Sequence, residues 1–306
     1  MKQKLLNNKL TLKNDDNLML VFILILVTIL VSIIKPSFLS LGTLESMAYQ
    51  LPEIGLLTLA MMVTMIAGGI NLSVIASANL SGIIMALIMT NFIPKGAENT
   101  IIVILAMIAG ITISIVIGFF NGVIISTFKI PAILVTLGTQ MLVNGICLVI
   151  TKGSIISGFP RFFKNIGNGK LLGIPTPIIL FIIGLIVLAI ILRRTSLGAG
   201  IYLYGSNNIA TIFSGVNDKA LIIKTYTLSG FFVGLAAIIL TSRFNSAATG
   251  YAETFLMQAI LAAVLGGTNP NGGGGKISGI ILSLIIFNYK KANINTPFLN
   301  LFIRNP

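Results

Sequence analysis

The chain has 306 residues, of which 56% are hydrophobic and only 9% are charged, and its mean hydropathy is +1.02. Soluble domains carry roughly 25% charged residues, so this composition excludes an ordinary soluble protein and indicates an integral membrane protein. Lys and Arg number 20 against 7 Asp and Glu, which gives a net charge of +13. Because basic residues that lie between apolar runs are attracted to anionic headgroups, we expect membrane lipid and not nucleic acid as the counter-charge.

The residue types also restrict the chemistry of the chain. There is no His, and the one Cys, Cys147, lies inside an apolar run. These counts exclude an internal disulfide and a His-based catalytic triad, and they provide no ordinary zinc cluster. Because no nucleophile is visibly paired with a base, we expect no enzyme activity, no metal and no cofactor.

Nine apolar runs follow one another along the chain, and a transmembrane helix needs about 20 mostly apolar residues. A head with four Lys, residues 1–17, precedes the first run, and no small-residue cleavage site follows it, which predicts an uncleaved first span. The second, eighth and ninth runs are short and adjoin Gly-rich joints, as broken or re-entrant helices do. The predicted spans are residues 18–34, 54–67, 73–92, 100–120, 132–150, 177–192, 221–241, 255–265 and 277–287.

The distribution of basic loops orients these spans, because such loops favour the cytoplasm. If the Lys-rich head is cytoplasmic, six spans place Arg193 and Arg194 on the same side. The loop of residues 152–174 then faces outward, although it contains four cations and no acid. These cations are either incidental or form a docking surface for an acidic extracellular partner: Lys152, Arg161, Lys164 and Lys170.

All seven acidic residues lie outside the predicted spans. Proton-coupled carriers place carboxylates or histidines within the membrane, so their absence argues against a proton-driven carrier. The energy for uphill transport would then come from another chain. A secondary carrier that holds sodium by backbone carbonyls at broken helices remains an alternative.

Uncharged polar residues occur within the third and fifth predicted spans at helical spacing. These residues either form hydrogen bonds between helices or line a path for a neutral, hydroxyl-rich solute. The candidates on the third span are Ser73, Ser77 and Ser81, and those on the fifth span are Thr136, Gln140 and Asn144.

Glycines form two motifs that could have a structural or a binding role. Gly118 and Gly122 form a GxxxG motif on the fourth span, which predicts close helix packing. The segment LGGTNPNGGGGKISG, residues 265–279, looks like a phosphate-binding loop. It has Pro270 where that motif needs its first Gly, and Ile277 where a Ser or Thr should follow Lys276, so we do not predict nucleotide binding there.

The loop RRTSLGAGIYLYGSNNIATIFSGVND contains a predicted amphipathic helix of about two turns. Its apolar residues, Ile209, Ile212, Phe213 and Val216, follow the spacing i, i+3, i+4, i+7. Ser206 or Asn207 can cap this helix. The helix either inserts into a groove of a partner protein, or lies against its own spans or the lipid surface.

Four segments resemble those of the sugar-type permeases of ABC transporters, the ribose, galactose and xylose family. They are GGINLSVIASANLSG, ILVTLGTQMLVNGICLVITKGSIISGFP, GSNNIATIFSGV and LGGTNPNGGGGKISG, and they occur in family order between residues 68 and 279. The resemblance implies an all-α polytopic permease of ten spans in the bacterial plasma membrane. Such a subunit passes a monosaccharide from an external binding protein to the cytoplasm, pairs with a second permease copy and is driven by a separate cytoplasmic ATPase.

The resemblance also implies roles for parts of the chain. Residues 1–306 would form a single permease domain with a cytoplasmic N-terminus, and residues 193–220 would be the loop that couples it to the ATPase. Residues 265–279 would be a structural turn at a broken helix. The implied coupling residues are Gly205, Asn207, Ile209, Ala210, Ile212, Phe213, Ser214, Gly215 and Val216.

Two features depart from this family. Asn71, a further candidate for the translocation path, stands where the family usually has Asp, which removes a negative charge but keeps a hydrogen-bond acceptor. The tail, residues 290–306, is too short and polar for a tenth span, so we expect about nine spans and a fold truncated at its C-terminus. The alternatives are a non-transporting remnant, or a permease for autoinducer-2, nucleosides or branched-chain amino acids.

Overall fold

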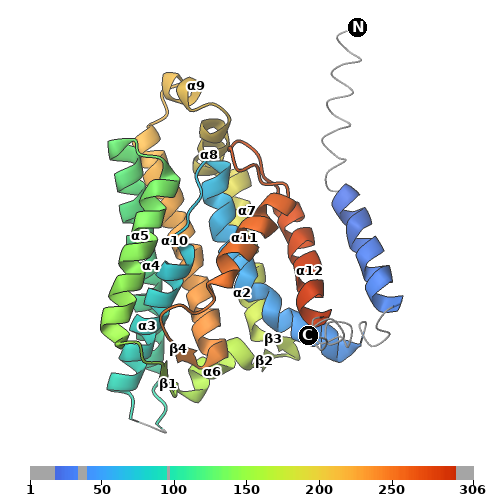
Figure 1. Ribbon diagram of the computed structural model, residues 1–306, viewed down its shortest axis with the longest axis vertical. Coiled ribbons are helices and arrows are strands. Elements are labelled where there is room, and N and C mark those ends of the chain that lie inside the picture. Colours follow the sequence, from blue (N-terminus) through green and yellow to red (C-terminus); the bar gives the residue numbers. More distant parts are fainter. Residues whose placement is uncertain (1–17, 34–39, 95–96, 294–306) are drawn as a thin grey trace, which may run out of the picture.

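The computed structural model describes residues 18–33, 40–94 and 97–293, with side chains up to residue 288. The predicted head, residues 1–17, and the tail beyond Asn293 lie outside this part of the chain. The described residues form a bundle of helices that run up and down along one long axis (Figure 1). The predicted all-α, multi-pass class is therefore confirmed.

Among the described residues, six helices are long and apolar enough to cross a membrane, and three apolar helices are shorter. The six are α2 (Leu41–Ile66), α3 (Val74–Phe92), α4 (Thr100–Phe128), α5 (Ala132–Thr151), α7 (Thr176–Arg194) and α10 (Asp218–Phe244). The shorter ones are Leu18–Ile33, α11 (Thr254–Leu265) and α12 (Ile277–Asn293).

The connecting segments add three short helices and two pairs of two-residue strands. The helices are α6 (Arg161–Asn168), α8 (Ser196–Ser206) and α9 (Asn208–Phe213). Strand β1 (Ile156–Ser157) pairs antiparallel with β4 (Ser246–Ala247), and β2 (Lys170–Leu171) pairs antiparallel with β3 (Ile174–Pro175).

The predicted length of the second span is wrong. Helix α2 begins at Leu41, where the Ser40 side chain caps it, and continues through Pro52 for 26 residues. The predicted start at Ile54 is therefore too late, because Pro52 and Glu53 both lie within the helix. As a result Glu53 lies inside a membrane-length helix and is only 2% exposed, contrary to the expectation that no acid lies within a span.

Burial divides the long helices into a central and a peripheral group. Most of α2, α3 and α10 is buried, whereas α4, α5 and α7 bury only about a quarter of their apolar windows. A helix that is apolar on all sides and surrounded by protein forms the core. The exposed apolar faces of α4, α5 and α7 are the surfaces that lipid or another membrane helix would cover.

Close packing of α4 against α10 confirms the structural prediction from the GxxxG motif. A Cβ on Gly118 would lie 2.3 Å from the Tyr226 carbonyl oxygen, and a Cβ on Gly230 would lie 2.3 Å from the Ser114 carbonyl oxygen. Gly122 faces the backbone of Ile223 in the same way. The two antiparallel helices therefore approach closely enough to require glycines on both sides.

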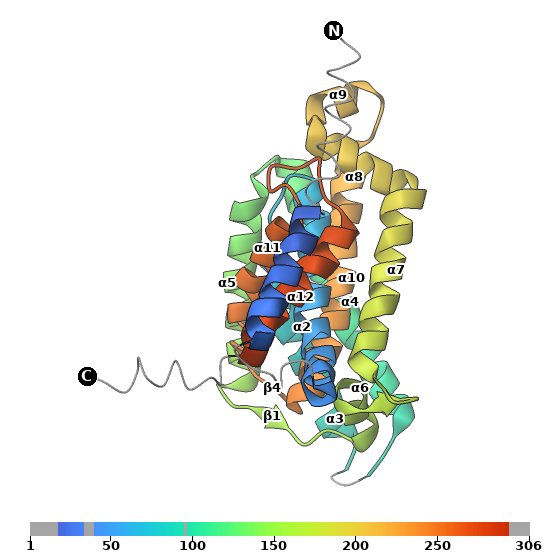
Figure 2. The same ribbon diagram turned by 90° about the vertical axis from the view of Figure 1, so that its right-hand side faces the viewer.

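The two ends of the bundle carry different structures. Helices α8 and α9 and the Gly-rich loop after α11 lie at one end, which we call the α9 end (Figure 2). Helix α6 and all four strands lie at the other, which we call the α6 end. The segments predicted to face the ATPase and the binding protein are therefore separated by the length of the bundle.

Candidate functional site

Helix α9 projects from the bundle with its apolar residues exposed. The Asn207 side chain accepts a hydrogen bond from the Ala210 amide at 2.9 Å, so the predicted cap is present. Ile209 is 63% exposed, Ile212 46% and Phe213 88%. The sequence left open whether this helix enters a groove of a partner protein or lies against its own spans or the lipid surface. In this structure its own spans do not cover these three side chains.

The predicted extent of this helix, residues 209–216, is partly wrong. The helix ends at Phe213 because the next residues form a turn in which Gly215 has a φ of +83°. Val216 lies beyond this turn and packs against the buried core, so it does not continue the exposed stripe. The Ser214 hydroxyl donates to the Ala210 carbonyl oxygen and ties the turn to α9.

The Gly-rich loop at the α9 end packs against the backbone of α2 and α8. The Gly273 amide donates to the Ile66 carbonyl oxygen at 2.8 Å, which satisfies an acceptor at the end of α2. The Tyr202 hydroxyl of α8 donates to the Gly275 carbonyl oxygen at 2.8 Å. A Cβ on Gly205 would lie 1.8 Å from the Ile66 carbonyl oxygen, so these segments meet backbone to backbone. The loop thereby fixes α8, which carries α9.

A buried polar cluster joins five helices in the bundle interior. The Asn71 amide donates to the Ser229 hydroxyl at 3.2 Å, and this hydroxyl donates to the Ala60 carbonyl oxygen of α2. The Ser73 hydroxyl donates to the Asn71 side-chain oxygen and accepts from the Asn121 amide of α4. Thr139 of α5 donates to the Asn121 oxygen at 2.6 Å. Mutual pairing of these groups offsets the free energy of burying them.

Thr136 holds the joint between α2 and α3 against α5. Its hydroxyl donates to the Ile70 carbonyl oxygen at 3.0 Å and accepts from the Leu72 amide at 3.1 Å. The joint therefore keeps its backbone groups satisfied where the chain leaves the helix. In this structure Asn71, Ser73 and Thr136 form interhelical hydrogen bonds.

The other candidates for the path are less fully paired. Ser81 of α3 is buried and Asn144 of α5 is half-buried, and neither the Ser81 hydroxyl nor the Asn144 side-chain oxygen has a hydrogen-bond partner among the described residues. Ser77 is buried on the same helix as Ser81, and Gln140 is half-buried one turn before Asn144. Unpaired buried acceptors of this kind are available to water or to a polar solute.

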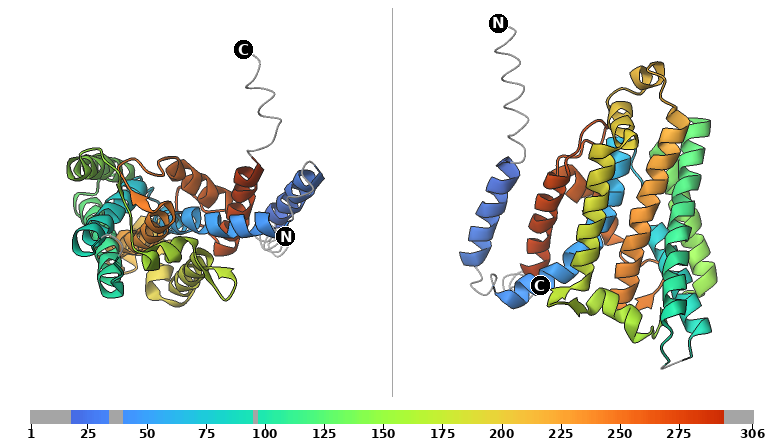
Figure 3. Two further views of the ribbon diagram at one scale, coloured as in Figure 1. Left: turned by 90° about the horizontal axis from the view of Figure 1, so that it is seen from below. Right: turned by 180° about the vertical axis from the view of Figure 1, so that it is seen from behind.

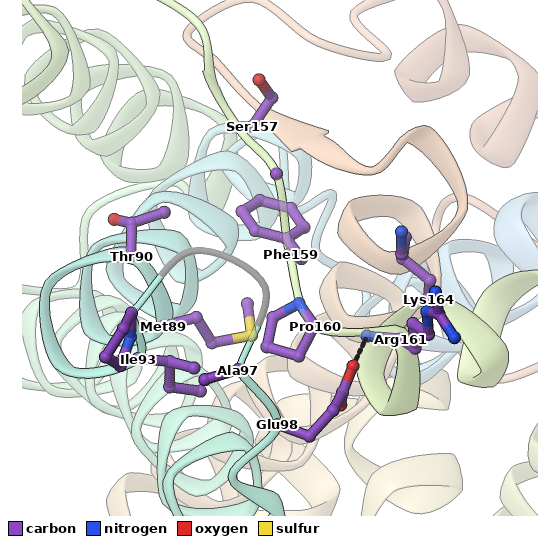
Figure 4. Close-up of a pocket in the computed structure, with 12 residues that line it drawn as sticks. Met89, Thr90, Ile93, Ala97, Glu98, Ser157, Phe159, Pro160, Arg161 and Lys164 are labelled. Atoms are coloured by element: carbon purple, nitrogen blue, oxygen red, sulfur yellow. Dashed lines mark hydrogen bonds between the residues drawn. The ribbon is translucent and has the colours of Figure 1, made fainter.

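At the α6 end, two of the four predicted docking cations line a cavity of about 740 Å³, which Figure 4 shows. Arg161 and Lys164 come from α6, and Glu98 from the segment before α4 faces them. The Glu98 carboxylate accepts hydrogen bonds from the Arg161 and Phe162 amides at 2.7 and 3.3 Å, so it caps the start of α6.

The other two docking cations lie elsewhere at this end. Lys170 forms an ion pair with Glu45 at 2.7 Å, and the hydrogen bond within this pair raises the pKa of Lys170. Lys152 is exposed after the last turn of α5 with a φ of +51°. The expectation of a purely basic loop is therefore incomplete, because acids from other segments fold against it.

Sequence reasoning missed a junction formed by Ser242 and Arg243 at the end of α10. The Ser242 hydroxyl donates to the Phe163 carbonyl oxygen and accepts from the Gly167 amide, so it holds α6. The Arg243 guanidinium lies 3.1 Å from the Glu53 carboxylate and donates to the Tyr49 carbonyl oxygen at 2.6 Å, so it holds α2. Two sequence signals were available: Arg243 ends a long apolar run, and Glu53 directly follows a Pro.

These features define the class of protein, an α-helical multi-pass membrane protein with an exposed apolar helix at one end. The family model described as branched-chain amino acid transport system / permease component matches residues 43–298. The chain belongs to this permease family. As a permease component it is a transport subunit and not an enzyme, as predicted from the sequence.

Similar proteins include three named permeases. Ribose import permease protein RbsC of Bacillus subtilis is 34% identical, over 89% of this chain and 83% of the relative. Its namesake in Escherichia coli is 33% identical, over 90% of this chain and 84% of the relative. Autoinducer 2 import system permease protein LsrD of Photorhabdus temperata is 30% identical, over 88% of this chain and 80% of the relative. No solved structure matches the chain.

Proposed function

We propose that this chain is the membrane-spanning permease of an ATP-driven importer that passes a monosaccharide into the cytoplasm of a bacterium. The observation that carries the proposal is the exposed apolar stripe of α9 at one end of a membrane bundle. Such a stripe suits insertion into a groove of a partner protein. The names of the ribose import relatives support a sugar as the solute.

The energy source is a separate ATPase that binds α9. Glu53, the acid buried within α2, is paired with Arg243 and does not provide a free carboxylate for a proton relay. The coupling loop, residues 193–220, places Ile209, Ile212 and Phe213 on the surface, while Gly205 and the Gly-rich loop fix its base against α2. Movement of the ATPase would therefore reach α2 through a backbone contact.

The topology follows from this assignment. The α9 end and the N-terminus lie in the cytoplasm, and the α6 end lies outside the plasma membrane. Nine crossings are made, of which those by α11 and α12 are short, within a single permease domain. The basic pair Arg193 and Arg194 ends α7 at the cytoplasmic side, as the positive-inside rule requires.

Solute passes along the faces of α3 and α5, where this copy meets a second permease copy. Ser81 and Asn144 have unpaired buried side-chain atoms among the described residues, and Ser77 and Gln140 lie one turn before them on the same helices. An external solute-binding protein docks on the α6 end. Arg161 and Lys164, which form no ion pair among the described residues, provide the contact with acidic side chains of that protein.

Copurification tests the proposal. The chain, tagged and expressed with its neighbouring genes, is extracted in mild detergent, and its partners are identified by mass spectrometry. We expect an ATPase in a one-to-one ratio with the permease. A chain that purifies without any ATPase would contradict the proposal. Competition for uptake by ribose, autoinducer-2, nucleosides and branched-chain amino acids then distinguishes the solutes.

A further inference from the structure

The hairpin formed by β2 and β3 at the α6 end exposes an apolar tip. Its two central residues, Leu172 and Gly173, have φ values of +53° and +83°, which is the arrangement of a type I′ turn. Leu172 is 96% exposed. The flanking residues Leu171 and Ile174 are 58% and 51% exposed, so three apolar side chains lie together on the surface.

Water and backbone geometry both disfavour Leu at this position. Asn and Gly adopt positive φ far more readily than Leu, and they are the usual residues of this turn. A polar side chain would also be better solvated. No other described part of the chain covers Leu172, so the disfavoured residue gains nothing from packing within the protein.

The position of α7 places the tip at the depth of a membrane interface. Helix α7 begins at Thr176, directly after β3, and its 19 residues span about 28 Å, close to the roughly 30 Å of bilayer hydrocarbon. Its exposed side chains, which include Ile182, Ile186 and Ile190, form a face for lipid. A strand of two residues reaches only about 7 Å, so the tip remains within the headgroup layer beside this face.

Two contacts hold the hairpin against the first turns of α2. Lys170 pairs with Glu45 at 2.7 Å, and the Tyr49 hydroxyl donates to the Gly169 carbonyl oxygen at 3.3 Å. The same turns of α2 expose Leu41 and Leu44. The strands lie beside the start of α2 at the edge of the bundle (Figures 1 and 3). Tyr49 and Lys170 have the amphipathic character typical of interfacial residues.

We propose that the β2–β3 hairpin is a lipid anchor that inserts Leu171, Leu172 and Ile174 into the interfacial layer of the bilayer. The surface it recognises is a phospholipid membrane. These three side chains continue the lipid-facing side of α7, and the hairpin is held at the end of α7 where that helix begins. That this is the outer leaflet rests on the proposed function. Insertion itself rests only on α7 crossing the membrane.

An environment-sensitive fluorophore tests this anchor. In a Cys147→Ala background, Leu172→Cys is labelled with nitrobenzoxadiazole and reconstituted into vesicles of phosphatidylethanolamine and phosphatidylglycerol. We expect a blue-shifted emission, quenching by lipids that carry a nitroxide high on the acyl chain, and a loss of quenching by aqueous iodide. Asn165→Cys, on exposed α6 at the same end, is the matched control and should be quenched by iodide.

Two results would overturn the anchor. Emission and iodide quenching at Leu172 equal to those at Asn165 would show that the tip lies in water. Shielding of the Leu172 probe only after the external binding protein is added would show a protein-docking surface instead. The first comparison uses vesicles without ATP, solute or partner, so its result does not depend on whether the chain transports sugar.

Discussion

Arg243 and its neighbour Ser242 link three helices at the α6 end. Pro52 has no amide hydrogen, and its ring displaces backbone carbonyls of the preceding turn, which weakens α2 at this point. Arg243 donates to the Tyr49 carbonyl oxygen in that turn and neutralises Glu53 in the next. Its neighbour Ser242 binds α6. Because Glu53 is buried, its charge becomes costly as soon as Arg243 is lost.

We expect Arg243→Gln to destabilise the protein by about 3 kcal/mol, because Glu53 would remain buried without its counter-charge. Glu53→Gln in the same chain should recover part of this loss, and a double-mutant cycle from unfolding in detergent measures the coupling. Additive effects of the two substitutions would contradict the role of this ion pair.

The polar cluster around Asn121 gives a second prediction for a single residue. Thr139→Val keeps the shape of the side chain but removes the donor to the Asn121 oxygen, so we expect a loss of about 1 kcal/mol. Thr112→Val is the control, because Thr112 is exposed on α4 and bonds only within its own helix. Equal melting temperatures of the two variants in detergent would contradict the prediction.

Between elements, the contact of α4 with α10 depends on glycine. Gly230→Ala would place a methyl group 2.3 Å from the Ser114 carbonyl oxygen, and we expect a loss of about 1 to 3 kcal/mol from overpacking. Gly138→Ala on α5 meets no atom within 4 Å and should be neutral or slightly stabilising. Thermal unfolding in detergent compares them, and a stable Gly230→Ala variant would refute the close approach.

A fourth prediction concerns α9. Phe213→Ala removes the most exposed side chain of its stripe, so it should reduce the amount of ATPase that copurifies while leaving the melting temperature of the permease unchanged. Leu203→Ala, an exposed apolar position on α8, is the control. If both variants retain the ATPase equally, α9 is not the docking element.

Local signals in the sequence predicted some elements better than others. The cap at Asn207 and the glycine contact at Gly118 depend on near neighbours or on a short motif, so both could be predicted. The start of α2 could not, because the helix continues through Pro52, and the Arg243 side chain that contacts the turn before this Pro comes from a distant segment. The junction at Ser242 and the ion pair of Lys170 join segments far apart in sequence, and no local pattern encodes such pairings.

For the whole molecule, the central feature is that the two proposed partner surfaces lie at opposite ends of one bundle. Helix α10 runs between them, from the α9 end at Asp218 to the junction with α2 and α6 at Arg243. Helix α2 spans the same distance in the opposite direction, from the Arg243 junction to the Gly-rich loop under α8. Two central helices are therefore in contact with both ends, which suits an importer that must respond to partners on both sides.

ATP-dependent uptake tests this function most directly. Proteoliposomes containing the chain with its copurified ATPase are supplied with the external binding protein and radiolabelled ribose, with ATP enclosed on the α9 side. We predict accumulation of ribose that requires both ATP and the binding protein and that falls in the Phe213→Ala variant. Uptake that continues without ATP, or no uptake of any monosaccharide by an assembled complex, would contradict a sugar importer.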